Sequence, residues 1–577
     1  MKILGISAFY HDAAAALIVD GRLVAAAQQE RFSRKKHDDA FPIDAIQSCL
    51  ELGGIKESEL DTVVFYDKPL LKFERILITH IATWPRSLPS FLKAMPVWLK
   101  RKLWVSRTIA KGLPEFTGPI LFSAHHLSHA ASAFYSSNFE EAAVLTVDGV
   151  GEWATCTLAH GQGNSLKILK EIRFPHSLGL LYSTITGILG FRVNSGEYKV
   201  MGLAPYGEPT YADALRQVVR QHDDGSFSLD LRYFGYVGGL KMYNSRLPKL
   251  LGIEPRLPES PIEQKHMNLA RSLQVVTEEI MMGLAQSAHA ITGAKKLCLA
   301  GGVALNCVAN ARILNDGPFD EIFVQPSAGD AGGAIGAAAY VAHAIHNDPR
   351  HPLEHAYLGP AFGDQECGDF VRDQGLPHQH FDDEGELLNA VVERLKAGQI
   401  IGFYHGRMEF GPRALGHRSI LADPRGDDMR ERVNAKIKKR EGFRPFAPSV
   451  PIEHASEWFD TESESPYMVL TATVKKRTIP AVTHVNGSAR LQTVRADQSP
   501  RYHRLLTQWG QATGCPVLLN TSFNVRGEPI VCTPEDAYKC FRGSGLDALV
   551  LENHILDKEA MTEEACWDEY AKQFNAD

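Results

Sequence analysis

The sequence predicts an α/β protein of two domains. With 577 residues, the chain is longer than the size at which one hydrophobic core stops growing. Residues 1–345 alternate apolar strand-like runs, glycine turns and helix-like segments, a pattern typical of α/β folds. Residues 346–364 are rich in Pro, His and charge, which indicates a domain boundary. We therefore expect one domain over residues 1–350 and a second over residues 351–577.

The first domain contains an apparent internal repeat. It opens with the strand-like runs KILGIS, AAAALIVDG and RLVAAAQQE, in which Asp20 and Gly21 form a hairpin turn. A similar unit begins with AAVLTVDGVGEWATCTLAHG, where Asp148 and Gly149 again lie between strand-like runs. The repetition predicts two related lobes.

A candidate metal site accompanies the second unit. In AHHLSHAASAF, His125 and His129 are one helical turn apart, so both imidazoles lie on one helix face. Asp148 follows an apolar run and would leave the carboxyl end of a strand. Two imidazoles and a carboxylate can hold a divalent ion, and the alternative is a solvated or capped helix face.

Two further loops follow strand-like runs later in the domain. In KKLCLAGGVALNCVANARIL, Gly301 and Gly302 precede a helix that contains Asn306, so backbone amides there can approach a phosphate or ribose, unless the glycines only turn the chain. Asp330 ends the loop before a small-residue helix, where it is either a helix N-cap or a fourth metal ligand. Two nitrogens and two carboxylates would suit Fe(II), Mn(II) or Zn(II) better than Mg or Ca.

The second domain carries a concentration of positive charge. Residues 405–444 hold eleven Lys/Arg against six Asp/Glu. Arginines among glycines, as in GRMEFGPRALGHRS, suit bidentate binding of phosphate oxygens. Residues 429–440 are alternatively a solvated basic helix.

A later apolar strand in this domain, PVLLNTSFNVRGEPI, opens into small polar side chains, which are placed to hold a nucleotide or phosphate. They are Asn520, Thr521, Ser522 and Asn524, followed by Arg526.

Composition narrows the class of protein. The formal net charge of −7 offers no global basic surface for nucleic acid, so we expect no nucleic-acid partner. The nine cysteines form no CxxC pair, which favours reduced thiols in the cytoplasm over zinc ribbons or disulfides. His11 and Asp12 interrupt the N-terminal apolar run, and no run is long enough to span a membrane.

One stretch allows several interpretations. Residues 84–107 interleave three tryptophans with six basic residues. The stretch could line the entrance for an acceptor, form a homodimer face or contact a membrane interface. The simplest alternative is an amphipathic helix whose Trp and Leu side chains join the core.

Several long motifs together carry a family resemblance. They are YHDAAAALIVDG, QQERFSRKKH, HHLSHA, VDGVGEW, EYKVMGLAPYG, LAGGVALNCVAN, GRMEFGPRALGHRSI, FRPFAP and LNTSFN. Across nearly the whole chain, the sequence resembles the NodU/CmcH family of O-carbamoyltransferases. The resemblance implies an N-terminal domain with the two-lobed core of actin and Hsp70-type ATPases (ASKHA), similar to tRNA threonylcarbamoyl-transferring proteins, and a C-terminal YrdC-like domain.

The resemblance also implies a reaction. The YrdC-like domain would use ATP, with Mg, and carbamoyl phosphate to make carbamoyl adenylate, and the first domain would pass the carbamoyl group to a hydroxyl of a small molecule or glycan. The family's iron ligands fall on His125, His129, Asp148 and Asp330.

Further roles follow from the same resemblance. His11 would be the general base for the acceptor, unless it is a core histidine. Groups assigned to carbamoyl phosphate and the ATP phosphates are Arg413, Lys438, Arg444, Arg495 and Ser522. Positions matching the family near the nucleotide are Lys36, Lys199, Gly202, Gly302 and Asn306, with a solvated basic run as the alternative for Lys36.

The sequence leaves two other functions open and argues against a third. A tRNA-directed threonylcarbamoyl factor would bind tRNA tightly and with strong salt dependence. A hydrogenase-maturation carbamoyl carrier would need cysteine-rich zinc modules, which this cysteine spacing does not provide. An ATP-binding regulator would bind nucleotide without turnover.

Overall fold

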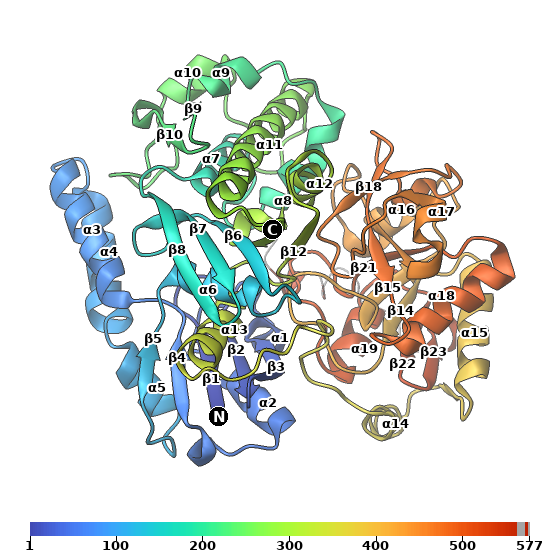
Figure 1. Ribbon diagram of the computed structural model, residues 1–577. Coiled ribbons are helices and arrows are strands. Elements are labelled where there is room, and N and C mark those ends of the chain that lie inside the picture. Colours follow the sequence, from blue (N-terminus) through green and yellow to red (C-terminus); the bar gives the residue numbers. More distant parts are fainter. Residues whose placement is uncertain (562–569, 571, 575–577) are drawn as a thin grey trace. The chain divides into compact units, whose positions relative to one another are not determined.

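The computed structural model describes residues 1–561, 570 and 572–574. The chain divides into two compact units. Unit 1 comprises Met1–Gln29 and His37–Leu353, and unit 2 comprises Glu30–Lys36 and Glu354–Asp577. The short segment Glu30–Lys36 therefore belongs to the C-terminal unit. The expected division at residue 350 placed this segment in the first domain. Figure 1 shows helices and sheets in both units, so the expected mixed α/β architecture is confirmed.

Unit 1 contains two five-stranded sheets with the same topology. The first has the order β3-β2-β1-β4-β5 and the second β12-β11-β6-β7-β8. In the first sheet, β1 pairs antiparallel with β2 and parallel with β4. In the second sheet, β6 pairs antiparallel with β7 and parallel with β11. The first-sheet strands are β1 (Lys2–Ser7), β2 (Ala14–Val19), β3 (Arg22–Gln28), β4 (Thr62–Phe65) and β5 (Ile120–Phe122). Those of the second are β6 (Glu141–Val147), β7 (Ala154–Gln162), β8 (Ser165–Arg173), β11 (Lys296–Ala300) and β12 (Glu321–Val324). The repeat predicted from the sequence is thus a repeated sheet topology.

Small residues let two helices pack closely in unit 1. Helix α13 (Gly332–Ala339) has the sequence GGAIGAAA and is buried along its whole length. A Cβ added to Gly5 of β1 would lie 1.9 Å from the Ala334 carbonyl oxygen, and one added to Gly336 would lie 1.7 Å from that of Ser128 in α6 (His125–Phe134). Glycine is therefore required at both contacts, which hold α6 and the start of α13 in place.

The remaining helices of unit 1 complete the two lobes and their connections. They are α2 (Ile43–Gly53), α3 (Pro69–Thr83), α4 (Leu88–Val97), α5 (Val105–Gly112), α7 (Leu178–Ile188), α8 (Glu197–Leu203), α9 (Ala212–Arg216), α10 (Arg246–Leu251), α11 (Gln264–Thr292) and α12 (Cys307–Asp316), and β9 (Val219–Gln221) pairs with β10 (Phe227–Leu229). Helix α11 presents a continuous buried face.

Unit 2 is built on an eight-stranded mixed sheet of order β13-β23-β22-β14-β15-β21-β16-β20. Successive side chains along its strands point to opposite faces of the sheet, and each face packs against its own hydrophobic core. Ile401 and Phe403 of β14 pack with one core, and Tyr404 packs with the other. Helices α15 (Glu384–Lys396) and α18 (Pro500–Thr513) cover the first core, and α14 (Asp364–Asp373) and α19 (Pro534–Arg542) cover the second. The strands are β13 (Gln379–His380), β14 (Ile401–Tyr404), β15 (Arg418–Ala422), β16 (Ala447–Pro451), β20 (Gln492–Val494), β21 (Leu518–Ser522), β22 (Ala548–Leu551) and β23 (His554–Asp557).

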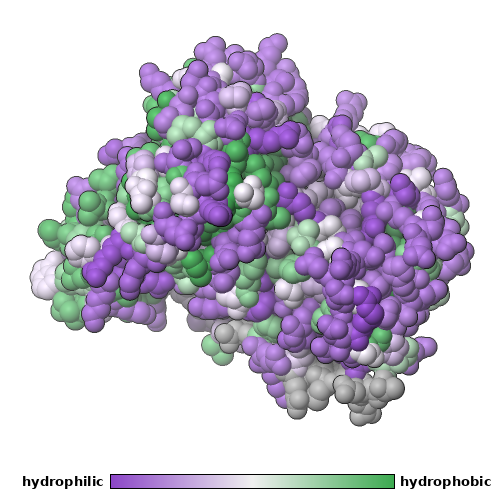
Figure 2. Space-filling model, turned by 90° about the horizontal axis from the view of Figure 1, so that it is seen from below, coloured by the Kyte–Doolittle hydropathy of each residue, from purple (hydrophilic) through white to green (hydrophobic). Residues whose placement is uncertain are grey.

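Four smaller features complete the description. A separate three-stranded sheet in unit 2 comprises β17 (Phe459–Asp460), β18 (Thr471–Val474) and β19 (Ser488–Arg490). Eight cysteines are buried free thiols, and Cys566 lies outside the described residues. Every helix in the described ranges is too short or too polar to cross a lipid bilayer. Figure 2 shows a mainly hydrophilic face with hydrophobic side chains gathered toward its left edge.

Candidate functional site

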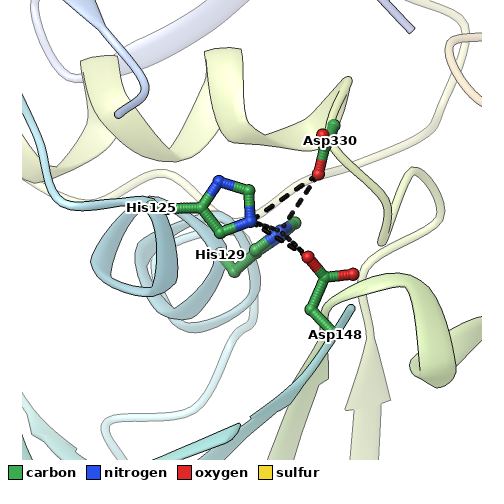
Figure 3. A group of neighbouring side chains, drawn as sticks. All are labelled: His125, His129, Asp148 and Asp330. Carbon is green, nitrogen blue, oxygen red and sulfur yellow. Dashed lines mark hydrogen bonds and ion pairs between the residues drawn. The ribbon is translucent and has the colours of Figure 1, made fainter. Parts of the chain in front are cut away.

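Four side chains from separate parts of unit 1 converge on one buried point (Figure 3). His125 and His129 lie one turn apart on α6, Asp148 follows β6, and Asp330 precedes α13. His125 Nε2 lies 3.0 Å from Asp148 Oδ2, 3.2 Å from His129 Nε2 and 3.7 Å from Asp330 Oδ1. His129 Nε2 lies 3.8 Å from Asp148 Oδ2 and 3.6 Å from Asp330 Oδ1. The structure therefore brings together all four predicted ligands.

Local contacts fix the orientation of this His/Asp group. Glu152 accepts hydrogen bonds from the backbone N–H of His125 at 3.0 and 3.1 Å, and so satisfies the start of α6. The Gly302 N–H donates to Asp148 Oδ1 at 3.0 Å, which leaves Oδ2 facing the histidines. Tyr66 donates its hydroxyl to Asp330 Oδ2 at 3.4 Å. Such outer contacts hold ligand groups in one orientation.

The donor set fits a divalent transition metal. Its four donor atoms lie within 4.8 Å of one another. The distances above bracket the roughly 3.4 Å that separates donors around a tetrahedral ion bound at about 2.1 Å. Burial lowers the pKa of His129, but Asp148 and Asp330 outweigh that effect and raise this pKa to about 9. Burial raises the pKa of Asp148, yet its hydrogen bonds to both histidines hold that pKa well below its usual value. The carboxylates of Asp148 and Asp330 thus favour a positive charge between the four side chains. A bound metal cation would supply such a charge.

His11 takes part in a second network in unit 1. Its Nδ1 lies 2.6 Å from Asp12 Oδ2, and its Nε2 donates to the carbonyl oxygen of Asn194 at 2.9 Å. His37 Nδ1 lies 2.8 Å from the other oxygen of Asp12. Burial lowers the pKa of His11, but the charge and hydrogen bond of Asp12 prevail and raise it to about 10. Both ring nitrogens face oxygen atoms, so this arrangement favours the imidazolium form, and His11 can accept a proton only after it has lost one.

The pKa of His11 predicts a pH-dependent stability. An ordinary histidine has a pKa of about 6.5 when unfolded, so the raised pKa of about 10 stabilises the folded state most fully below pH 6.5. This contribution is lost as pH rises toward 10. We expect the thermal midpoint of the wild type to fall more between pH 7 and pH 10 than that of His11→Gln. The surface variant His160→Gln should follow the wild type, and equal pH profiles for wild type and His11→Gln would contradict the assignment.

Other predicted nucleotide residues of unit 1 have structural partners. Asn306 caps α12 by accepting from the Ala309 N–H at 3.1 Å, and its side-chain amide pairs reciprocally with Gln274 at 3.0 and 3.1 Å. Lys199, 1% exposed, and Gly202 lie on α8. Gly302 instead joins the His/Asp group. Asp330 is not a helix cap, because α13 begins at Gly332 with Ala331 as its cap.

In unit 2, Lys438 is the centre of a buried polar cluster. It ends the π-helical segment Val433–Lys438, which follows α16 (Met429–Arg432), so residues 429–440 are only partly a solvated basic helix. Lys438 Nζ donates to the backbone oxygen of Ser522 and to Oδ1 of Asn524 at 2.7 Å. Burial, followed by the charges of Arg440 and Arg444, holds the pKa of Lys438 well below its usual value. Lys438 is therefore a buried amine that is held by oxygen acceptors and is subject to the positive charges of two nearby arginines in the sequence.

The remaining unit 2 residues predicted to bind phosphate or nucleotide are partly or fully buried. Arg444 is half-buried, 3.8 Å from Glu441 in an ion pair, and Arg413 is half-buried next to the buried Ala414. Asn520 is buried and donates to Gln492 Oε1 at 2.8 Å, whereas Thr521 is half-buried in β21.

Arg495 is not brought to the Lys438 cluster. Near the start of β16, Ala447 pairs with Asn520, and at its end Pro451 pairs with Val494. Arg495 therefore follows the sheet beside the carboxyl end of β16, whereas Ser522 lies near the amino end of that strand. Its guanidinium pairs with Asp497 at 3.0 Å and Glu464 at 3.2 Å.

The segment Glu30–Lys36 is linked to the Lys438 cluster within unit 2 through Glu528. Within it, Arg34 donates to Glu528 Oε1 at 2.8 Å and to the Ile530 carbonyl oxygen at 2.7 Å. Asn524 in turn donates to the backbone oxygen of Glu528 at 2.7 Å. Lys36 is half-buried at the end of this segment and lies in unit 2, and its nucleotide role stays a prediction.

Glu528 should be important for the stability of unit 2. Its side chain is fully buried and accepts from Arg34, Tyr570 and the Val525 N–H. Removing one partner of a buried ion pair leaves the other charge uncompensated and costs about 3–5 kcal/mol. We expect Glu528→Ala to lower the free energy of unfolding by about 3 kcal/mol in urea denaturation. Glu535→Ala, which removes an exposed partner of Lys539, should change it by less than about 0.5 kcal/mol. Equal effects of the two variants would contradict this role.

Sequence reasoning missed several groups that shape these sites. Glu152 lies in the VDGVGEW motif, and its proximity to the metal ligands in sequence was the available signal. Tyr66 and Arg34 are far in sequence from the groups they contact, so no local pattern indicated them. Arg407 and Arg418, arginines of the glycine-rich stretch, donate to backbone carbonyl oxygens, Arg407 to that of Leu358 and Arg418 to that of His405.

Comparison with known proteins identifies the family. The model "Carbamoyltransferase N-terminus" matches residues 2–339, and "Carbamoyltransferase C-terminus" matches residues 392–558. The chain belongs to the carbamoyltransferase family, a family of transferases.

Its relatives specify the NodU/CmcH type. An uncharacterized protein of Synechocystis sp. is 49% identical over 100% of both chains. Nodulation protein NolNO of Sinorhizobium fredii is 39% identical over 96% of this chain and 80% of its own. The 3'-hydroxymethylcephem-O-carbamoyltransferase of Streptomyces clavuligerus is 28% identical over 90% of this chain and 92% of its own. The predicted resemblance to NodU/CmcH carbamoyltransferases is confirmed.

Proposed function

We propose that the protein is an ATP-dependent O-carbamoyltransferase that makes carbamoyl adenylate and transfers the carbamoyl group to a hydroxyl of a small molecule or glycan. The observation that carries the proposal is the buried Lys438, whose amine donates to the backbone oxygen of Ser522 and to Asn524 Oδ1 and whose pKa is lowered by burial and by the charges of Arg440 and Arg444. An anion bound beside Lys438 would favour the charged form of its amine, which burial and the two arginine charges disfavour. The family membership and the cephem O-carbamoyltransferase relative support the carbamoyl chemistry.

The proposed first step is the activation of the carbamoyl group in unit 2. That unit 2 is YrdC-like is part of the same proposal. Loss of phosphate from carbamoyl phosphate by hydrolysis leaves carbamate. A carbamate oxygen then attacks the α-phosphorus of ATP and releases pyrophosphate. Arg444 and Lys438 would bind the phosphate oxygens, because guanidinium and ammonium groups offset charge on two polyanions that repel each other. Ser522 and Asn524 hold the Lys438 ammonium in position.

The second step would take place in unit 1. The acceptor hydroxyl attacks the carbonyl carbon, AMP leaves, and the hydroxyl proton passes to a base. We assign that base to His11, with Asp12 to stabilise the imidazolium formed. Because His11 is protonated in the network seen here, this role requires that substrate binding lower its pKa or that the Asn194 contact open.

The His/Asp group would hold the metal through His125, His129, Asp148 and Asp330, and we propose Fe(II), with Mn(II) or Zn(II) as the other candidates. When bound, such an ion supplies Lewis-acid stabilisation of charge on phosphate or carbonyl oxygens. Within the chain, Glu152 and Gly302 keep the donor atoms directed at this point. We also propose that the enzyme acts in the cytoplasm.

Pyrophosphate exchange tests the activation step. Labelled pyrophosphate should enter ATP only in the presence of carbamoyl phosphate, because adenylate formation is then reversible on the enzyme. Exchange that is absent, or that needs no carbamoyl phosphate, would refute carbamoyl adenylate as the intermediate.

A further inference from the structure

Residues 76–114 expose an unusual number of large hydrophobic side chains. This basic helical segment comprises the end of α3, all of α4, the π-helical turn Trp98–Lys102 and α5. Of the eighteen large hydrophobic side chains exposed in the described part of the chain, eight lie here. They are Ile78, Ile81, Trp84, Leu88, Leu92, Val97, Leu99 and Trp104. The expectation that Trp and Leu of residues 84–107 join the core is therefore wrong for Trp84, Leu88, Leu92, Leu99 and Trp104.

Internal packing of the segment uses a different set of side chains. Phe73 and Trp98 have ring centroids 5.9 Å apart, and those of His80 and Phe91 are 4.8 Å apart. The first contact joins α3 to the π-helical turn and the second joins α3 to α4, whereas no residue of α4 is buried. In Figure 1 the two helices stand at the left edge of unit 1, the side on which Figure 2 shows the hydrophobic side chains gathered. The segment thus has a formed inner contact and an apolar outer surface.

The same segment is strongly basic. Residues 76–114 contain seven Lys/Arg and no Asp or Glu, in a chain whose formal net charge is −7. Six of these basic residues are exposed: Arg86, Lys93, Lys100, Arg101, Arg107 and Lys111. Arg101 lies over the ring of Phe9 at 5.0 Å. The remaining five make no ion pair with any described residue, so their charges are available to an anionic surface.

We propose that residues 76–114 bind the surface of an anionic lipid bilayer. Exposed Trp and Leu beside Lys and Arg are typical of helices that lie in the bilayer interface, where rings and aliphatic side chains enter the headgroup boundary and cations contact anionic headgroups. A second copy is a poorer occupant, because a two-fold contact through this surface would bring two sets of like charges together. The mode is interfacial, since the described helices do not span a bilayer. This inference is independent of the proposed reaction.

Vesicle flotation of the full chain tests the proposal. The protein should float with vesicles of phosphatidylcholine and phosphatidylglycerol at low salt, and at least about tenfold less with pure phosphatidylcholine. The triple variant K93E/K100E/R107E should lose binding to anionic vesicles by at least about tenfold. The matched variant K167E/R220E/K295E makes the same change in net charge at exposed sites elsewhere and should bind like the wild type.

A second pair of variants tests the hydrophobic contribution. L92S/W104S should also weaken flotation, whereas L240S/L257S, which changes exposed leucines elsewhere, should not. Thermal unfolding shows whether each variant is folded. Absence of flotation with anionic vesicles, or equal loss in test and matched variants, would overturn the proposal. A wild-type dimer that L92S/W104S converts to monomer, with no vesicle binding, would assign the surface to a second copy instead.

Discussion

Arg444→Ala is expected to reduce carbamoyl-phosphate-dependent formation of AMP and pyrophosphate by at least about 100-fold. The charge of Arg444 lowers the pKa of the buried Lys438, and in the proposed reaction the Arg444 guanidinium binds phosphate oxygens. The measurement is chromatography of nucleotide products at saturating ATP. Arg477→Ala, which removes an exposed arginine of the same unit, should retain wild-type turnover.

His11→Ala separates the two steps of the proposed reaction. Because His11 lies in unit 1 and the Lys438 cluster lies in unit 2, this variant should form AMP and pyrophosphate but fail to carbamoylate an acceptor. Equal loss of both steps in His11→Ala would remove its assigned role. Arg495→Ala should have only a small effect on activation, because Arg495 forms ion pairs with Asp497 and Glu464 and is not part of the Lys438 cluster.

His125→Ala is expected to reduce the bound metal, measured by elemental analysis, from about one ion per chain by at least about tenfold. The variant removes one of two imidazole donors, and even partners outside the ligand set change affinity by about 10- to 100-fold. His160→Ala is the matched control, because His160 lies on β7 and contacts Glu141 rather than the His/Asp group. Unchanged metal content in His125→Ala would refute the site.

The His/Asp group shows what local sequence can predict. The four-residue spacing placed His125 and His129 on one helix face, and the apolar run before Asp148 placed that carboxylate at a strand end. Both features depend only on backbone periodicity. The approach of Asp330 could not follow from spacing, because it depends on how α13 packs against β1 and α6 through Gly5 and Gly336. The metal and the roles of these residues remain predictions.

Unit 2 shows where sequence reasoning was less effective. The basic composition of residues 405–444 indicated anion binding, but it did not show that Arg407 and Arg418 hold backbone carbonyls while Lys438 lies at the buried cluster. Arg495 resembled a phosphate ligand in sequence, yet strand register directs it to the far end of β16. Lys36 belongs to unit 2 because a segment distant in sequence, through Arg34, pairs with Glu528. These placements depend on long-range pairing, which no local pattern encodes.

The most direct test of the central claim needs no acceptor. The purified protein is incubated with ATP, Mg²⁺ and carbamoyl phosphate, and AMP, ADP and pyrophosphate are measured by chromatography. The two-step carbamoyltransferase account predicts AMP and pyrophosphate in equal amounts, formed only when carbamoyl phosphate is present. ATP that remains intact, or that becomes ADP whether or not carbamoyl phosphate is added, would contradict it.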